Sequence, residues 1–374
     1  MPPIFDAHLD IAWNALSWDR DQLISIDKLN AAEKGMTGKT RSRCTVSLPE
    51  MRRGQIPVCV ATMLARAYLD SPNYESTDVS VLHIRGHKEI IVRENLDYAN
   101  QTIASAVAQG QLAYYRLLER QGHVRIIENA GQLDDIWTSR DEGNDRPLGI
   151  ILSMEGCDPI VDLDQADWWW EKGLRTACLA HYGPSHYAMG TGADGQVTDR
   201  GRQLLRRFDE LGMILDLVHT ADTAVEQCLD LFNGAVFISH GNCRAIVDHD
   251  RQLSDEQIRL VAERGGVIGI VIDNWMLKSG WRQNPDRSRV SLETVADHID
   301  HICQLAGSAH HVGIGSDLDG GYGSEQIPGD INTIADLVKL EPVLRSRGYN
   351  DTDINGVMHG NFLRFFRDAL PAGQ

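Results

Sequence analysis

The sequence is poor in positive charge and has no long apolar run. Its 374 residues include 36 basic and 53 acidic residues, which gives a formal net charge of −17 at pH 7. Binding to nucleic acid or to an anionic membrane surface needs a positive face, so the composition argues against both. No stretch reaches about 18 consecutive apolar residues, so we expect no transmembrane helix. Small anionic substrates are not excluded, because one arginine can dominate a pocket.

The cysteines do not form the patterns of a secreted or a metal-thiolate protein. The seven cysteines are odd in number, scattered, and nowhere arranged as CxxC. Several lie in apolar runs, as buried free thiols do. The sequence opens without a basic segment followed by an apolar one, so we expect no signal peptide. These features predict a protein of the reducing cytoplasm.

Two common catalytic signatures are missing as well. There is no GxSxG motif, which argues against the nucleophile turn of a serine hydrolase. The segment DAHLDIAWNA, which follows the start of the first predicted strand, carries no glycine-rich phosphate loop. A doubly wound nucleotide-binding sheet usually has one. Other side chains are therefore expected to carry the function.

What the sequence does contain is a series of short apolar runs separated by helical patterns. Continuous runs of Val, Ile and Leu are typical of parallel strands buried on both faces. Eight such strands are predicted, at 3–8, 56–64, 148–155, 174–181, 213–219, 235–240, 266–272 and 311–317. Eight β/α units favour an α/β fold of the closed (β/α)₈ or TIM-type barrel. We expect one barrel domain over residues 1–374, with insertions at 11–55 and, mostly helical, at about 65–147.

Ionisable residues lie at the ends of most of these strands. They are His8, Asp10, Glu155, His181, His219, His240 and Asp317. Because barrel strands are parallel, these side chains should meet at the C-terminal mouth, where barrel enzymes keep their active sites. Crowded carboxylates and imidazoles need a cation between them, and a ligand set without thiolates suits Zn²⁺, or more loosely Mn²⁺ and Co²⁺. A bridging carboxylate would allow two adjacent metal sites.

Five motifs, in order along the chain, resemble the membrane (renal) dipeptidase family of the amidohydrolase superfamily. They are HLD at residues 8–10, SMEG around Glu155, LDLVH ending at His219, FISHG around His240 and GIGSDLDG around Asp317. MHGNFLRFF resembles the closing helix of the family, so the similarity runs from residue 4 to about residue 367. The sequence looks like a soluble, bacterial-type member of that family.

The resemblance assigns two divalent ions, expected to be Zn²⁺, to five residues. One ion would be held by His8 and Asp10, the other by His219 and His240, and Glu155 would bridge the two. In this family the glutamate stands where many relatives use a carboxylated lysine, and no predicted strand here ends in lysine. The resemblance implies that a metal-activated hydroxide attacks the peptide bond of a short dipeptide.

Further residues acquire roles by the same resemblance. His181 would bind substrate and steady the scissile carbonyl oxygen, and Asp317 would transfer protons in catalysis. Arg251, in DHDRQLSDEQ, would bind the terminal carboxylate of the substrate. The family also implies a homodimer. Asp6 and Asp319 stay open between a supporting role at the site and a purely structural one.

The substrate is the least determined part of this prediction. The segment VIGIVIDNWML, 267–277, carries an apolar residue about where animal relatives have a substrate-contacting tyrosine. Another amidohydrolase reaction, on N-acyl amino acids or lactones, would use the same metals. A non-catalytic metal-bearing interaction protein is a remote alternative, because it should have lost a reactive residue and none is missing. The pair His310 and His311 precedes the eighth strand and is expected at the opposite end of the barrel, in a structural role.

Overall fold

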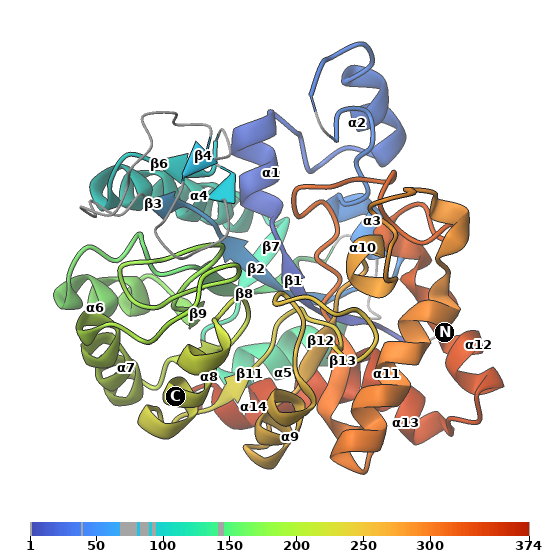
Figure 1. Cartoon of the computed structure of the whole chain (residues 1–374). Coiled ribbons are helices and arrows are strands. Elements are labelled where there is room, and N and C mark those ends of the chain that lie inside the picture. The colour runs from blue at the N-terminus through green and yellow to red at the C-terminus, as the bar shows by residue number, and fades with distance from the viewer. Residues whose placement is uncertain are drawn as a thin grey trace.

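Eight parallel strands form a barrel at the centre of the computed structural model (Figure 1). The structure describes residues 2–38, 40–67, 81–82, 90–91, 95–140 and 146–373. The barrel strands are β1 (Phe5–Leu9), β2 (Val58–Met63), β8 (Leu148–Glu155), β9 (Leu174–Cys178), β10 (Ile214–Asp216), β11 (Val236–Phe237), β12 (Ile268–Ile270) and β13 (Val312–Ile314). Their order is β11-β10-β9-β8-β2-β1-β13-β12, and a parallel bridge between Ile238 and Ile268 joins its two ends. The eight predicted strands and the barrel class are confirmed.

The barrel strands are buried because helices surround them. Every residue of β2 and β8 is buried, and the two strands pair without interruption from Val58–Gly149 to Met63–Met154. A strand with no solvent face carries an apolar run instead of an alternating pattern, which is why these runs were recognisable in the sequence. Several predicted strands extend too far at their C-terminal ends, since β9 stops at Cys178 and β13 at Ile314, whereas the prediction for β8 is correct at both ends. Beyond those points the chain turns into the loops that carry the site.

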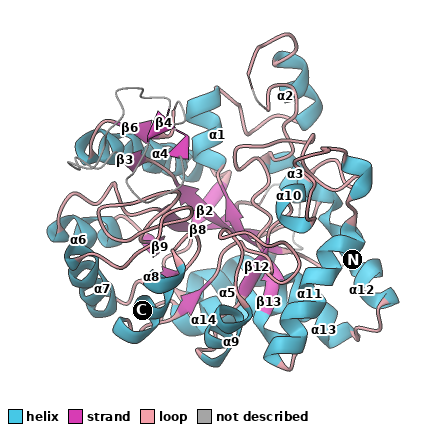
Figure 2. Cartoon of the chain, in the orientation of Figure 1, coloured by secondary structure: helices cyan, strands magenta, loops and turns pink. Residues whose placement is uncertain are grey.

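Helices lie outside the strands (Figure 2), and several of them begin or end at capping residues. They are α5 (Ala130–Ser139), α6 (Leu163–Glu171), α7 (Asp199–Leu211), α8 (Asp222–Leu231), α9 (Asp255–Glu263), α11 (Leu292–Ala306), α12 (Leu340–Ser346), α13 (Asp351–Asn355) and α14 (Asn361–Ala369). The hydroxyl of Thr198 caps α7 by accepting the N–H of Gly201, and Gly212 ends that helix in a left-handed conformation. Ser254 and Gln257 form a capping box at the start of α9. Of the helices in the described ranges, none is both long and apolar enough to cross a membrane.

Two long segments between barrel strands add further elements. The segment after β1 forms α1 (Ile11–Trp18), α2 (Ile26–Ala32) and α3 (Leu48–Arg53). Between β2 and β8 lie β3 (Arg66–Ala67), β4 (Val81–Leu82), β5 (Ile90–Ile91), β6 (Asp97–Tyr98), the long helix α4 (Gln101–Arg120) and β7 (Val124–Ile126), followed by α5. The predicted insertion at about 65–147 falls partly outside the described residues, and the assignment of one domain to the whole chain stays a prediction.

β7 belongs to the barrel sheet but is not predicted from the sequence. It pairs in parallel with the first residues of β8, from Val124–Leu148 to Ile126–Ile150, whereas β9 pairs with the second half of β8. A strand of three residues with Arg125 at its centre is too short to show a periodic pattern. β8 therefore has three neighbours, and its C-terminal end, which carries Glu155, lies between β2 and β9.

The closing helix α14 packs against residues at the start of the barrel strands. The ring of Phe5, the first residue of β1, lies 5.4 Å from that of Phe366 and 5.8 Å from that of Phe362. Phe237 of β11 contacts the same helix, with its ring 5.5 Å from that of Phe366. Aromatic pairs at these distances add to the stabilisation that burial itself provides. The family-like MHGNFLRFF segment thus closes the end of the barrel that lies opposite the predicted mouth.

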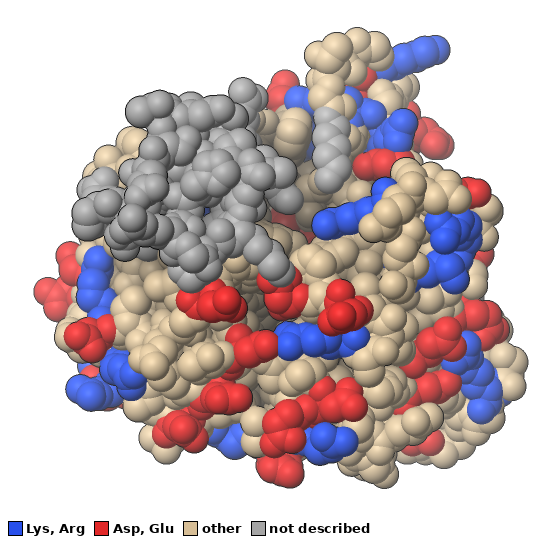
Figure 3. All heavy atoms as spheres, viewed as in Figure 1, with Lys and Arg blue, Asp and Glu red and all other residues tan. Residues whose placement is uncertain are grey.

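Charge is distributed as the composition predicts. On the face shown in Figure 3, acidic side chains are spread widely among basic ones, and the coloured residues form no broad basic area. A nucleic-acid surface needs clustered Lys and Arg. The surface in view therefore gives no support to a nucleic-acid partner.

Candidate active site and metal centre

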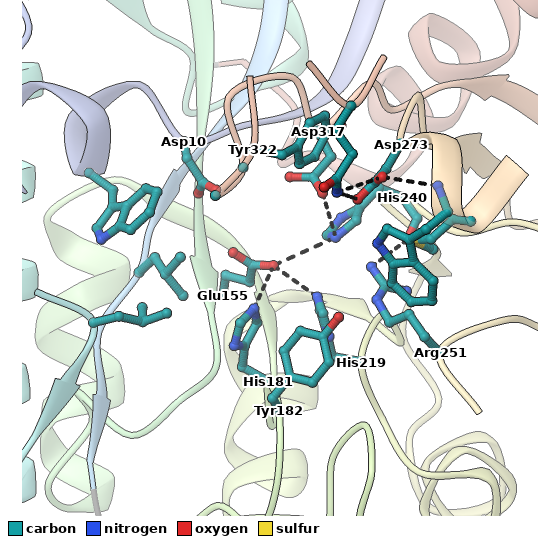
Figure 4. Close-up of a pocket in the computed structure, with 18 of the residues that line it drawn as sticks. Asp10, Glu155, His181, Tyr182, His219, His240, Arg251, Asp273, Asp317 and Tyr322 are labelled. Atoms are coloured by element: carbon teal, nitrogen blue, oxygen red, sulfur yellow. Dashed lines mark hydrogen bonds and ion pairs between the residues drawn. The ribbon is translucent and has the colours of Figure 1, made fainter. Parts of the chain in front are cut away.

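The loops that follow the barrel strands line one cavity (Figure 4). Arg251 and six of the seven predicted strand-end residues line it, namely Asp10, Glu155, His181, His219, His240 and Asp317. The seventh, His8, lies behind them and is 1% exposed, with its Nε2 3.6 Å from Oε2 of Glu155. Residues from six different strands or strand ends thus meet, as the parallel barrel predicts.

Glu155 lies at the centre of this cluster. Its Oε1 is 3.2 Å from Nε2 of His219, 3.5 Å from Nε2 of His181 and 3.7 Å from Nε2 of His240. Its other oxygen, Oε2, faces His8. Two groups of potential ligand atoms share this carboxylate: His8–Glu155–His240 and Glu155–His181–His219. Oε1 thus faces three histidines and Oε2 faces His8, so the carboxylate offers one oxygen to a cation on either side.

A third group of potential ligand atoms consists of His8, Asp10 and Asp317. Nε2 of His8 is 3.9 Å from Oδ1 of Asp10 and 3.7 Å from Oδ1 of Asp317. The carboxylate of Asp10 also accepts a short hydrogen bond from the hydroxyl of Thr62 on β2. These groups associate His240 with His8, whereas the resemblance pairs it with His219. Which histidines would share an ion therefore stays a prediction.

The donor set fits divalent cations. Within the described part of the chain, Nδ1 and Nε2 of His8 and Oε2 of Glu155 are buried without a hydrogen-bond partner. Leaving buried polar atoms unpaired costs free energy, so such a cluster points to a missing partner. Imidazole nitrogens and carboxylate oxygens without a thiolate are ligands that suit Zn²⁺. The residues present are therefore able to hold the metal that the resemblance implies.

Electrostatics at the cluster favour the same conclusion. Burial raises the pKa of Glu155 well above its usual range, and the nearby charges of Asp10 and Asp317 raise it further. Burial, helped by the charge of Arg251, lowers the pKa of His8 to about 3. The imidazoles are thus kept neutral, with lone pairs able to bind a metal, while the carboxylates repel one another. A cation between them would relieve the repulsion.

Two site histidines are supported by hydroxyl groups on the ring nitrogen that faces away from Glu155. Nδ1 of His219 lies 3.1 Å from Oγ1 of Thr191, and Nδ1 of His240 lies 2.9 Å from Oγ of Ser239. Partners of this kind orient histidine ligands toward a metal. Neither hydroxyl was singled out in the sequence, although Ser239 directly precedes His240.

Two buried aspartates tie neighbouring strands together below the site. Asp6 of β1 accepts hydrogen bonds from the backbone N–H and the hydroxyl of Ser316, which directly follows the β13 region. Asp216 of β10 accepts the N–H of Ser239 beyond β11. In both cases the donor residue immediately precedes a predicted site residue. Asp6 therefore supports the position of the site, and Asp216 does the same without having been predicted.

The turn after β13 carries two aspartates with left-handed backbones, Asp317 at φ 55° and Asp319 at φ 63°. The carboxylate of Asp319 accepts the backbone N–H groups of Thr45 and Val46, each at 2.9 Å. Such φ values are unfavourable outside glycine and persist where the surroundings hold them. Asp319 thus anchors the 11–55 segment to the turn that presents Asp317, and it does not line the cavity.

The wall around Arg251 contains residues that the sequence analysis missed. Arg251 is 5% exposed and donates from Nη2 to the carbonyl of His240 at 3.3 Å. Asp273, at the start of α10 (Asn274–Leu277), lines the same cavity, and both its oxygens accept from Nε2 of Gln326. Asp273 is the first charged residue after the apolar run of strand seven. The signal that identified the other strand ends could therefore have found it too.

A comparison with protein families covers nearly the whole chain. The model of the family described as membrane dipeptidase (peptidase family M19) matches residues 1–372. The chain belongs to the membrane dipeptidase family. The resemblance drawn from five short motifs is confirmed, and the match spans both insertions as well as the barrel.

Individual relatives in the membrane dipeptidase family are moderately similar to this chain. Dipeptidase 3 of Mus musculus is 32% identical over 263 residues, which cover 67% of this chain and 51% of the relative. Dipeptidase 3 of Homo sapiens is 31% identical over 276 residues, covering 71% and 54%. The match thus spans about half the length of these curated relatives. A metallo peptidase from Rhodobacter sphaeroides, solved with a phosphinate mimic of the dipeptide L-Ala-D-Ala, shares the fold with a TM-score of 0.76 at 20% identity, over 99% of both chains.

Proposed function

We propose that this chain is a metal-dependent dipeptidase that hydrolyses the peptide bond of short dipeptides in the cavity described above. The observation that carries the proposal is the position of Glu155, whose Oε1 faces His181, His219 and His240 while its Oε2 faces His8. Membership of the membrane dipeptidase family supports the same activity. The proposal extends to two Zn²⁺ ions, because the ligand atoms separate into groups that share one carboxylate.

The proposed ligands are those that the resemblance assigns. His8 and Asp10 would hold one ion, His219 and His240 the other, and Glu155 would contact both. When bound, such ions supply Lewis acidity, which lowers the pKa of a water molecule toward neutrality and polarises the scissile carbonyl. The barrel contributes the fixed spacing of these side chains, because each lies on or just beyond a buried strand.

Asp317 is the proposed proton-transfer residue. It would accept the proton of the attacking water and pass it to the leaving amine, the combined base and acid roles that peptide hydrolysis requires. Burial raises the pKa of Asp317 well above its usual range, and the charge of Asp10 adds to this effect. A carboxyl group with a raised pKa can hold a proton long enough to deliver it, whereas an exposed aspartate would release it to solvent.

Arg251 and His181 are the proposed substrate-binding residues. A guanidinium in the wall of the cavity can bind a carboxylate through two parallel hydrogen bonds, which selects substrates whose terminal carboxylate lies near the scissile bond. His181, with Nε2 3.5 Å from Oε1 of Glu155, faces the region where the carbonyl oxygen would lie. A fixed distance between Arg251 and His181 would make long peptides poor substrates.

A substrate panel tests this proposal. Zn²⁺-loaded protein would be assayed on L,L and L,D dipeptides, N-acyl amino acids and lactones, with metal content measured on the same preparation. We expect turnover of dipeptides and about two ions per chain. Hydrolysis of N-acyl amino acids or lactones with no dipeptide turnover would contradict the proposed dipeptidase activity and favour another amidohydrolase reaction. Bound metal without turnover of any substrate would favour a non-catalytic, metal-bearing interaction protein.

We also propose a cytoplasmic location and a homodimer. All seven cysteines are free and six are buried, which agrees with a reducing compartment. The homodimer rests on the family alone, and light scattering of the purified chain would test it. No nucleic-acid or membrane partner is proposed.

A further inference from the structure

Three histidines turn toward Glu155 in the cavity (Figure 4). Their outward-facing nitrogens contact different groups. Nδ1 of His219 and Nδ1 of His240 contact hydroxyl oxygens. Nδ1 of His181 instead lies 3.4 Å from Nη1 of Arg66. Because a neutral imidazole carries its proton on one nitrogen only, the partner of Nδ1 determines what Nε2 presents to the cavity.

The hydroxyl partners leave a lone pair on Nε2. Oγ1 of Thr191 donates its single proton to the carbonyl of His219, at 3.3 Å, so it can only accept from Nδ1 of that histidine. Oγ of Ser239 lies 2.9 Å from Nδ1 of His240 and is able to accept from it in the same way. In both histidines Nδ1 then carries the proton, and Nε2 faces Glu155 as a lone pair that can bind a metal.

The contact with Arg66 requires the opposite tautomer of His181. A guanidinium has only donors, so the contact requires a lone pair on Nδ1 and places the proton of the neutral ring on Nε2. That Nε2–H points toward Oε1 of Glu155, 3.5 Å away. A protonated nitrogen cannot be a metal ligand. His181 is therefore set apart from the neighbouring histidines although its ring nitrogen lies equally close to the shared carboxylate.

Arg66 is itself held in place by the segment between β2 and β8. It lies on β3, is 7% exposed, and its Nε and Nη2 donate to the two oxygens of Asp97 on β6, at 2.5 and 2.6 Å. Nη1 also donates to the carbonyl of Tyr182, at 3.3 Å, next to His181. A bidentate pair of this kind fixes the plane of the guanidinium. The donor aimed at Nδ1 is thus preorganised.

We propose that Arg66 is a positioning residue that fixes the tautomer of His181, so that this histidine acts as a hydrogen-bond donor to the reacting carbonyl oxygen and not as a metal ligand. The part of this inference that concerns the carbonyl oxygen rests on the proposed function, whereas the tautomer assignment does not. The inserted segment thereby contributes to the chemistry at the mouth. Preorganised hydrogen-bond donors to the oxygen on which negative charge develops are among the largest contributors to catalysis of acyl transfer.

Nitrogen NMR of the histidine rings tests the tautomer directly. The experiment uses Zn²⁺-loaded protein, which is diamagnetic, with ¹⁵N-labelled histidine and with His181→Gln to assign the resonance. We expect a proton on Nε2 of His181, and protons on Nδ1 of His219 and His240. A proton on Nδ1 of His181 would overturn the inference, whatever the enzyme hydrolyses. Absence of dipeptide turnover would instead overturn the proposed function, and the ring spectrum would still decide the tautomer.

Substitution of Arg66 tests the consequence for catalysis. Arg66→Met should lower kcat by about 10- to 100-fold, as loss of an outer partner typically does, with metal content unchanged. Arg66→Lys keeps a donor but not the fork, so it should recover part of the loss. Arg175→Met is the matched control. Arg175 is also 7% exposed and forms an ion pair with Glu128, but it lies at the start of β9 and does not line the cavity. Unchanged kcat in Arg66→Met, or an equal loss in the control, would overturn the inference.

Discussion

Buried histidines occur both at the barrel mouth and in the surrounding helical layer, and the two regions treat them differently. In α11, Nδ1 of His298 accepts the backbone N–H of Cys243 and its Nε2 contacts the carbonyl of Leu277, both at 3.1 Å. His311, half-buried before β13, contacts the carbonyl of Gly266. At the mouth, His8 is as deeply buried, yet the described residues give neither of its ring nitrogens a hydrogen-bond partner. The backbone satisfies the ring nitrogens of the structural histidines, whereas both ring nitrogens of His8 stay available.

Buried carboxylates show the same contrast. Glu33, in the 11–55 segment, lies 2.8 Å from Arg20 and 2.7 Å from Arg41. Burial acts to raise its pKa, but hydrogen bonds from Arg20 and from the N–H of Ser42 outweigh this and lower it. No arginine in the described residues forms an ion pair with Glu155, and burial raises its pKa although the charge of Arg251 acts to lower it. The difference teaches that Glu33 has a paired cation of the protein, whereas Glu155 is left for the cation that the metal centre is expected to supply.

The largest effect is expected when the shared carboxylate at the mouth is neutralised. Glu155→Gln keeps the size of the side chain but removes the charge that both proposed ions need, so bound metal and activity should be lost together. Elemental analysis and a dipeptide assay on the same sample measure this. A variant with both ions and full turnover would contradict the assignment.

Neutralising the structural carboxylate provides the control for that experiment. Glu33→Gln leaves Arg20 buried without its full counter-charge, and breaking a buried pair typically costs about 3–5 kcal/mol of stability. Urea unfolding should show the loss, while metal content at 25 °C stays normal. If Glu33→Gln also released the metal, the contrast between the two carboxylates would be wrong.

The next largest effect concerns Asp317. Asp317→Asn should leave the metals in place and reduce kcat by about 10²–10⁴-fold, because general acid–base catalysis typically contributes this much. Substrate should still bind through Arg251, so isothermal titration should give a measurable Kd. Loss of metal would make Asp317 chiefly a ligand, which its position 3.7 Å from Nε2 of His8 also allows.

A smaller effect is expected at the wall of the cavity. Arg251→Lys replaces a planar fork by a point charge, and loss of a buried charge-assisted contact costs about 2–5 kcal/mol. This corresponds to a fall of roughly 30- to 4000-fold in kcat/KM. Amidation of the C-terminus of the substrate should produce a similar loss in the wild type. Equal cleavage of acid and amide would show that Arg251 does not bind the carboxylate.

The parts of the molecule that could be predicted from the sequence are those whose signal lies within a single strand. Each barrel strand is a buried apolar run that ends at or shortly before an ionisable residue, so both the fold and residues such as Glu155 and His219 could be found by reading along the chain. Contacts between distant segments leave no such local signal. Arg66, Thr191 and Asp216 act through partners on other elements, and β7 is too short for a pattern. These could be placed only in three dimensions.

The smallest effect lies in the helical layer and appears as pH-dependent stability. Burial lowers the pKa of His298 from 6.5 to about 4. The unfolded chain therefore binds a proton below pH 6.5 that the folded chain does not take up until about pH 4, so stability falls as the pH falls through this window. The full loss of stability from this group is about 3 kcal/mol.

Urea unfolding of metal-stripped protein between pH 7.5 and 4.5 should show a shallower dependence of stability on pH in His298→Gln than in the wild type. Equal slopes in wild type and His298→Gln would mean that burial does not keep His298 neutral in the folded protein.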